Sequence, residues 1–197
     1  MTTNSPSGYH YFVHAEMNRS DKIQSWIVNG LLHSKLAQEK RESSVQWELK
    51  HSSGVIQFAR LLAQKRNVNE ELVEIAAGLH DVHVMVNGTY DNHAKLGAGI
   101  AKNLLESSGN FLKSEINQIE EAIANHSDKH VYSDNPLVEL IKDADCFDCF
   151  FYGDTVYDYK KPEILKQYYN RIVKIRNEFG LPSKKYFSEK LTHSQIR

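Results

Sequence analysis

Apolar residues recur along most of this 197-residue chain at the spacing of one face of an α-helix. Val55, Phe58, Ala59 and Leu62 give the clearest case, because they follow an i, i+3, i+4, i+7 pattern. The same spacing returns in five later segments: residues 73–80, 97–105, 116–126, 137–144 and 164–175. Residues 82–86 (VHVMV) form a short β-branched run, but no partner segment alternates with a period of two. The pattern therefore predicts an all-α fold.

Residues that favour helix ends punctuate this pattern. Asn69 precedes two glutamates, an arrangement typical of a helix N-terminus, where the dipole favours anions. Pro136 and Pro162 each stand where a first helical turn would begin. The turn-rich segment 87–92 (NGTYDN) predicts a loop, and residues 20–50 read as one or two helices leading into the core.

Composition narrows the class of protein. Lys and Arg total 24 and Asp and Glu total 25, so the formal net charge of -1 argues against a partner that is a long nucleic acid. No apolar run approaches the roughly 20 residues that span a bilayer, and the first residues lack a secretory pattern. With two cysteines there is no disulfide framework, so we expect a soluble protein of the cytoplasm that has no membrane partner.

Histidines and aspartates interrupt several of the apolar faces. A buried carboxylate is costly unless it is paired or binds a metal, and several such residues near helix ends indicate a common meeting point. Imidazole and carboxylate groups together are ligands for Zn, Mn, Fe, Co or Ni. The candidate ligands are His51, His80, Asp81, His93, His126 and Asp145.

The order of these residues resembles that of the HD-domain superfamily of metal-dependent phosphohydrolases. Four local elements carry the resemblance beyond His51: LHD at 79–81, HAKLGAGIA at 93–101, EAIANHS at 121–127 and KDADCFD at 142–148. The resemblance covers residues 47–153. It implies an all-α HD-domain helical bundle, with five helices around the metal site. We expect an N-terminal extension (1–45, irregular and then helical), an HD metal-binding domain (46–153) and a helical C-terminal extension (154–197) that packs on it.

The resemblance also implies roles for the candidate residues. His51, His80, Asp81 and Asp145 would hold a first divalent metal, drawn from Mn, Fe, Co, Ni, Zn or Mg. Asp81 would bridge to a second metal held by His93 and His126, although these two histidines could instead face a substrate phosphate. Asp145 is preferred to Asp143 because the latter points roughly 200° away on a helix.

The activity implied is hydrolysis of a phosphate ester in a nucleotide or a related small molecule. Asp81 or Asp148 would accept a proton, although Asp148 could instead orient a ligand histidine. Lys95 is the preferred contact for substrate phosphate, ahead of Lys50 and Lys129. The alternatives are a di-iron oxygenase of the same fold, or a metal-stabilised sensor or interaction domain. A homo-oligomer is also left open.

Other residues fit the pattern less well. Cys146 and Phe147 replace a basic residue and a leucine that the resembling subgroup carries, and only 13 positions separate His80 from His93. His83 and His130 are interpreted as residues near the pocket rather than ligands. The two thiols, Cys146 and Cys149, are interpreted as inert. The remaining histidines are expected at the surface: His10, His14, His33 and His193.

Overall fold

The computed structural model describes residues 17–151 and 161–182, and within these ranges every regular element is a helix. The all-α prediction is therefore confirmed for this part of the chain. Predictions for residues 1–16, 152–160 and 183–197 lie outside the described residues. The elements are α1 (Arg19–Leu32), the 3₁₀ helix η1 (Gln38–Lys40), α2 (Val45–Arg66), α3 (Glu70–Leu79), α4 (Val82–Asn87), α5 (His93–Ser108), α6 (Lys113–Asn125), α7 (Pro136–Phe151) and α9 (Pro162–Glu178).

The predicted helix ends are set by local chemistry. The Asn69 side chain accepts a hydrogen bond from the Leu72 backbone N–H at 3.1 Å and so caps α3. α7 and α9 begin at Pro136 and Pro162 as predicted. α5 ends at Gly109, whose positive φ of 67° suits glycine. The starts at Asn69, Pro136 and Pro162 confirm what the sequence indicated.

The β-branched run at residues 82–86 is helical, not extended. It lies in α4, a six-residue helix whose Val82 and Val84 are fully buried. No strand in the described chain could pair with it, and packing against α1 and α5 decides its conformation. Burial in a helical core thus overrides the intrinsic preference of valine for strands.

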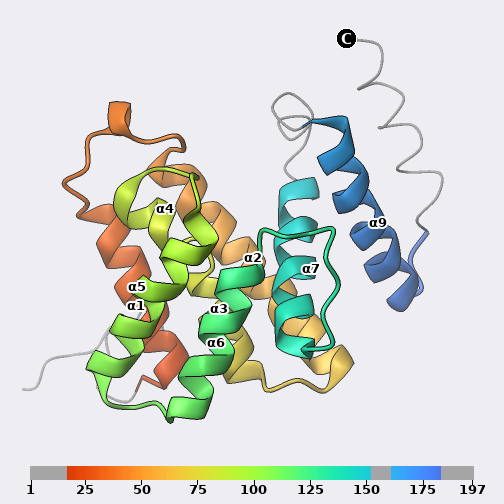
Figure 1. Cartoon of the computed structure of the whole chain (residues 1–197), viewed down its shortest axis with the longest axis horizontal. Helices are drawn as coiled ribbons and strands as arrows, with labels where there is room; N and C mark the ends of the chain where they lie inside the picture. Colours follow the sequence, from red (N-terminus) through yellow and green to blue (C-terminus); the bar gives the residue numbers. More distant parts are fainter. Residues whose placement is uncertain (1–16, 152–160, 183–197) are drawn as a thin grey trace, which may run out of the picture.

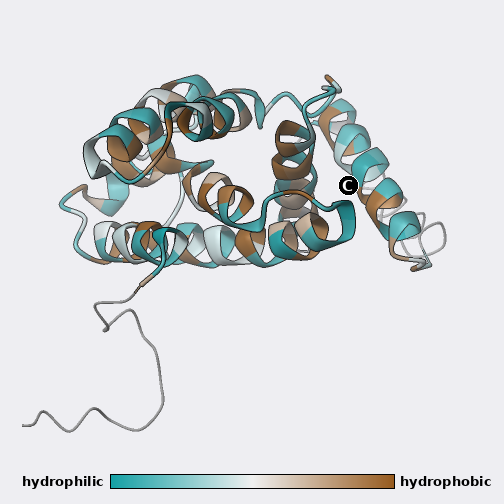
Figure 2. Ribbon diagram, turned by 90° about the horizontal axis from the view of Figure 1, so that it is seen from below, coloured by the Kyte–Doolittle hydropathy of each residue, from teal (hydrophilic) through white to brown (hydrophobic). Residues whose placement is uncertain are grey.

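Helix α3 lies at the centre of the fold. It packs against α1, α2, α6 and α7, and seven of its ten residues are buried. Figure 1 shows α7 next to α2, with α9 beyond α7 at one end of the molecule. Most helices are amphipathic, with hydrophobic and hydrophilic residues on different faces (Figure 2). The central position of α3 therefore brings helices that are far apart in the sequence around it.

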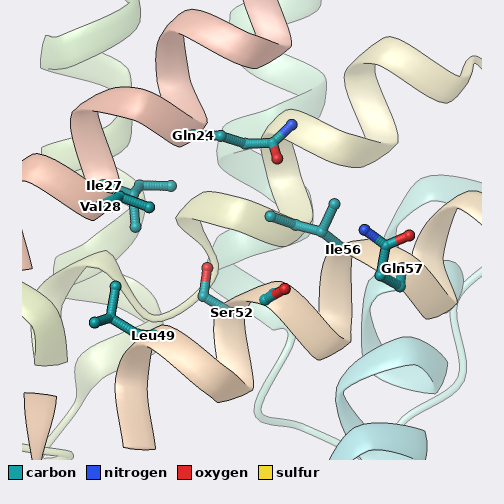
Figure 3. A pocket seen from close by; sticks show the side chains of 8 residues that line it. Gln24, Ile27, Val28, Leu49, Ser52, Ile56 and Gln57 are labelled. Atoms are coloured by element: carbon teal, nitrogen blue, oxygen red, sulfur yellow. The ribbon is translucent and has the colours of Figure 1, made fainter. Parts of the chain in front are cut away.

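A small cavity of about 170 Å³ lies between α1 and α2 (Figure 3). Its lining includes Ile27 of α1 and Ser52 of α2. Because Ser52 follows His51 directly, neighbouring residues of α2 face two different environments, this cavity and the place where the candidate ligands lie.

None of the described helices has both the length and the apolar character needed to cross a bilayer.

Helices α2 and α7 approach each other closely at Gly54. A Cβ placed on Gly54 would lie 1.8 Å from Oδ1 of Asp148. The Asp148 side chain is buried and holds Lys50 Nζ at 3.2 Å. The absence of a side chain at Gly54 therefore creates the space that Asp148 occupies.

We predict that Gly54→Ala lowers the free energy of unfolding by about 1–3 kcal/mol, because the added methyl group must displace Asp148 or separate the helices. Urea denaturation monitored by circular dichroism measures the change. Gly99→Ala is the matched control, since a Cβ at Gly99 meets nothing within 4 Å. This control should raise the stability by about 0.5–1 kcal/mol. Equal effects of the two substitutions would contradict the close approach.

Candidate metal centre

The candidate ligands come from six different helices or their ends. His51 lies within α2, Asp145 lies within α7, and His93 is the first residue of α5. His80 and Asp81 lie where α3 ends and α4 begins, and His126 follows the last residue of α6. The backbone turns at Asp81, which has φ −104° and ψ 23°. All six side chains gather at one place, where His93 is half-buried and the others are buried.

All four histidines are oriented through their Nδ1 atoms. His80, His93 and His126 each place Nδ1 2.7–2.8 Å from a backbone carbonyl oxygen, that of Ala77, Tyr90 and Ile123 respectively. A carbonyl only accepts, so Nδ1 carries the proton in each ring. His51 Nδ1 likewise donates to Oδ2 of Asp148 at 2.7 Å. In the neutral rings, every Nε2 is therefore a free lone pair.

The Nε2 atoms meet in two pairs on either side of Asp81. His51 Nε2 and His80 Nε2 are 3.2 Å apart, and they lie 3.8 and 3.3 Å from Asp81 Oδ2. His93 Nε2 and His126 Nε2 are 3.1 Å apart, and each lies 3.3 Å from Asp81 Oδ1. The two oxygens of one carboxylate thus face two separate groups of nitrogen lone pairs.

Asp145 adds a second carboxylate on the His51 side. Its Oδ1 lies 3.4 Å from His51 Nε2 and accepts from Cys149 Sγ at 3.3 Å. Its Oδ2 accepts a short hydrogen bond from Lys129 Nζ. One oxygen of Asp145 therefore faces the histidines, and the other is neutralised by an ammonium group.

The charge states follow from burial and neighbouring charges. Burial raises the pKa of Asp81, but His80 and His126 lower it well below its usual range, so this carboxylate is ionised. Burial lowers the pKa of His126 to about 4, so its Nε2 is unprotonated at neutral pH. Burial also lowers the pKa of His51, but the hydrogen bonds that its ring donates to Asp145 and Asp148 overcome this effect and raise the pKa to about 10. The buried carboxylates thus draw positive charge into the site, either as a proton on His51 or as a cation in its place.

These observations together fit a divalent metal centre. Asp81 Oδ1 is buried and has no hydrogen-bond partner, which is costly without a cation. Facing lone pairs on His93 and His126 repel each other unless a cation lies between them. Nitrogen and carboxylate oxygen are the usual donors for Zn, Mn, Fe, Co and Ni, and the ordered Nδ1 partners match those of metal-bound histidines. The residues present therefore fit a divalent metal, which these histidines and carboxylates would hold.

The candidate ligands open onto a cavity of about 760 Å³. Ligand residues His51, Asp81, His93, His126 and Asp145 line it. The walls come from the segment 42–47, from Tyr90, from the loop after α6 and from α9. Residues from these walls include Glu42, Ser43, Trp47, Tyr90, Ser127, Lys129, Lys161, Ile164 and Tyr168.

Two sequence-predicted site residues lie elsewhere. Lys95, the preferred phosphate contact, is exposed on α5 and is not among the residues that line the cavity, because its helix position points away from the His93 side. Asp148 is buried behind His51 and also does not line the cavity. Its contact with His51 Nδ1 matches the orienting role rather than direct proton acceptance.

The residues that the sequence analysis did not assign as ligands either have other partners or are exposed. Asp143 faces away from the histidines and pairs with Arg171 at 2.7 Å. His83 contacts Asn87 and Thr89, while His130 and His33 are exposed. His10, His14 and His193 lie outside the described residues.

Sequence reasoning underrated two residues. Lys129, which the sequence ranked behind Lys95, is 3% exposed and contacts Asp145, and its position three residues after His126 is the signal that could have favoured it. Cys149 lies near enough to His51 and Asp145 to join a group of ligands. Its i+4 spacing from Asp145 on α7 placed it on the same helix face.

Comparison with known proteins gives two matches. A family model described as HD domain matches residues 49–149, a segment that includes all six candidate ligands. A crystal structure of a "predicted HD superfamily hydrolase" from an uncultured Thermotogales bacterium shares 24% identity, covers 80% of this chain and 89% of that chain, and has a TM-score of 0.48. Among curated proteins, none matches the chain.

The family model spans slightly more than half of the 197 residues, from the second turn of α2 to the end of α7. Its limits coincide with the helices that gather His51, His80, Asp81, His93, His126 and Asp145. On this evidence, the chain belongs to the HD-domain family.

Proposed function

We propose that this protein is a metal-dependent phosphohydrolase that uses two divalent cations. One observation carries the proposal: the two oxygens of Asp81 each face a pair of histidine Nε2 lone pairs. Membership of the HD-domain family supports the same class of reaction. When bound, such cations lower the pKa of a coordinated water and neutralise negative charge on a phosphoryl group.

The residues around the cations have separable tasks. Asp81 faces both histidine pairs with its two oxygens and would hold metal between them. Asp148 is a positioning residue, since it fixes the ring of His51 through Nδ1 at 2.7 Å. His93 is half-buried and lies closest to solvent among the ligands, so the half of the site with His93 and His126 is where substrate enters.

The cavity supports a small phosphorylated substrate such as a nucleotide. Its volume of about 760 Å³ lies within the range of sites for small molecules, roughly 300–1,000 Å³. Trp47 and Tyr168 provide aromatic surface, and Lys129 and Lys161 provide positive charge. A net charge of -1 supports local rather than long-range attraction of anions.

We predict that Asp81→Asn abolishes metal-dependent turnover and removes most of the bound metal. The substitution makes one of the two shared donor atoms an amide nitrogen, which cannot bind a cation. Turnover is measured as phosphate release from an aryl phosphate and a nucleotide panel with Mn, Co or Ni, and metal content by elemental analysis. An Asp81→Asn protein with full metal and full activity would refute the site assignment.

Asp148→Asn should weaken metal binding about 10–100-fold without abolishing it, because His51 loses its carboxylate partner but keeps its Nε2. Competition with a chromogenic chelator measures the affinity. Asp143→Asn is the matched control, since it also removes a buried carboxylate from α7 but contacts Arg171 instead of His51. We expect the control to lower thermal stability and leave metal affinity unchanged. The opposite ranking would show that Asp148 does not position a ligand.

The same measurements distinguish the alternative functions. Tight binding of two irons with oxygen uptake would favour an oxygenase of the same fold. Full metal content without turnover across the panel would favour a sensor or interaction domain. Loss of phosphate release when a chelator removes the metal, followed by its return when Mn is added, separates both of these outcomes from hydrolysis.

A further inference from the structure

A buried ammonium group lies beside the candidate metal centre. Lys129 Nζ donates to Oδ2 of Asp145 and, at 2.5 Å, to the backbone oxygen of His126. Both acceptors belong to candidate ligand residues, so the ammonium is tied to the cluster from two sides. Within the described chain these contacts engage two of its three N–H donors, and the residue lines the cavity. The third donor is therefore available to a molecule in the cavity.

Arg171 of α9 holds the backbone that carries this lysine. Its side chain is fully buried, and its Nε donates to the carbonyl oxygen of Lys129 at 2.8 Å. Nη2 donates to the carbonyl oxygen of Val131 at 3.3 Å. The guanidinium therefore donates hydrogen bonds to two carbonyl oxygens of the loop that follows α6, where this loop lies beside the candidate metal centre.

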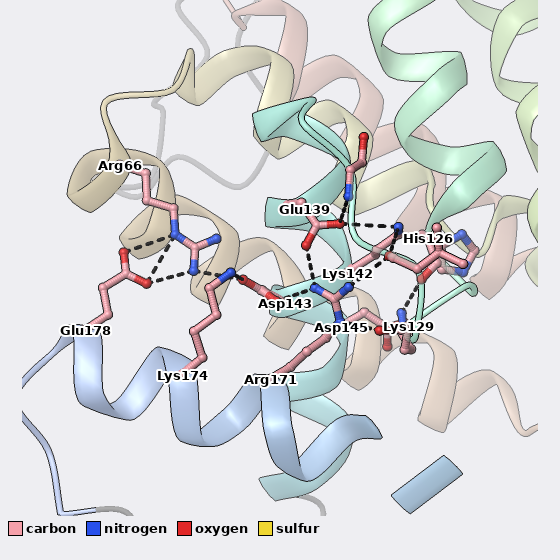
Figure 4. Close-up of polar contacts among 12 residues, drawn as sticks. Arg66, His126, Lys129, Glu139, Lys142, Asp143, Asp145, Arg171, Lys174 and Glu178 are labelled. Carbon is pink, nitrogen blue, oxygen red and sulfur yellow. Dashed lines mark hydrogen bonds and ion pairs between the residues drawn. The ribbon is translucent and has the colours of Figure 1, made fainter. Parts of the chain in front are cut away.

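The other side of the same guanidinium is fixed to α7. Nη1 of Arg171 lies 2.7 Å from Asp143 and 2.9 Å from Glu139 (Figure 4). Lys142 supports the same loop, because its Nζ donates to the carbonyl oxygen of Val131 at 2.8 Å. Arg171 thus connects α7, which carries Asp145, to the loop that carries Lys129.

Helix α9 lies outside the segment that matches the family. The match ends at residue 149, and α9 spans Pro162–Glu178. This helix also lines the cavity with Ile164 and Tyr168, and the Tyr168 ring centroid is 5.9 Å from Lys129 Nζ. A part of the chain that follows the matched segment therefore contributes to the surroundings of the ammonium.

We propose that Lys129 donates a hydrogen bond to a phosphoryl oxygen of the substrate, and that Arg171 positions Lys129 for this contact from α9. The inference rests on the proposed function for the identity of the bound group. An ammonium fixed in advance stabilises an oxyanion without reorganising when charge develops on the phosphoryl oxygens. Lys129 then takes the place that the exposed Lys95 cannot occupy.

Inorganic phosphate is the probe for Lys129, added to protein saturated with Mn. We expect Lys129→Met to weaken phosphate binding about 10–100-fold in calorimetry, the loss typical of one charge-assisted hydrogen bond. Metal content is verified in the same samples. If Lys129 only neutralises Asp145, the variant changes metal affinity but binds phosphate normally once saturated, and the proposal is overturned. Lys129→Gln keeps the question testable if the methionine variant fails to fold.

Arg171→Gln tests the positioning role, with Arg66→Gln as the matched control. Arg66 also pairs with Asp143, at 2.8 Å, but its other partner is Glu178 and it does not touch the Lys129 loop (Figure 4). We expect both variants to lower thermal stability and only Arg171→Gln to weaken phosphate binding, by several-fold. Equal phosphate affinities in these two variants would overturn the positioning role.

A double-mutant cycle determines whether Arg171 acts through Lys129. If it does, adding Arg171→Gln to Lys129→Met produces no further loss of phosphate affinity, and additive losses would contradict the proposal.

Turnover is recorded separately. Metal-dependent turnover that Lys129→Met leaves unchanged overturns this inference but not the proposed function. Phosphate binding that depends on Lys129 in a protein without turnover supports the inference and overturns the hydrolase. A wild-type protein that binds no phosphate overturns the inference.

Discussion

The site is organised by one buried carboxylate placed between two pairs of imidazole rings. Asp81 Oδ2 faces His51 and His80, and Oδ1 faces His93 and His126. Its position depends on the turn between α3 and α4, and α3 is itself packed by helices on several sides. Burying this carboxylate is costly unless positive charge lies beside it. The hydrophobic fold and the chemistry of the site therefore meet at the end of α3.

The hydrogen bonds that the four histidines donate from Nδ1 fix the orientation of their rings as ligands. Three of the four histidines donate to the carbonyl three residues earlier, at or next to a helix end. Ala77 and Ile123 lie in the last turns of α3 and α6, and Tyr90 lies in the loop before α5, so their carbonyls can each accept a hydrogen bond from an imidazole. His51 lies mid-helix, where its own carbonyls are already used, and it relies on Asp148 of α7 instead. Gly54 provides the space for that carboxylate.

The buried guanidinium of Arg171 connects the lysine beside the site to helices α7 and α9. Arg171 is fully buried and contacts two carboxylates of α7 and two carbonyls of the loop after α6. A buried guanidinium is tolerated because its donors are satisfied by these partners. The same contacts fasten α9 to the rest of the fold. Stability of the C-terminal helix and the placement of Lys129 are thus consequences of one ion network.

The sequence by itself determined the all-α class, the helix ends at Asn69, Pro136 and Pro162, and the order of the histidines and aspartates, because periodicity and capping are local properties. It misjudged Lys95 and left the role of Asp148 open. Which side chains face one another across α2, α7 and α9 depends on packing between segments about 30 to 100 residues apart. Only the tertiary structure could therefore show that the two oxygens of Asp81 face different pairs of histidines, that Asp148 contacts His51 and that the ammonium of Lys129 lies beside Asp145.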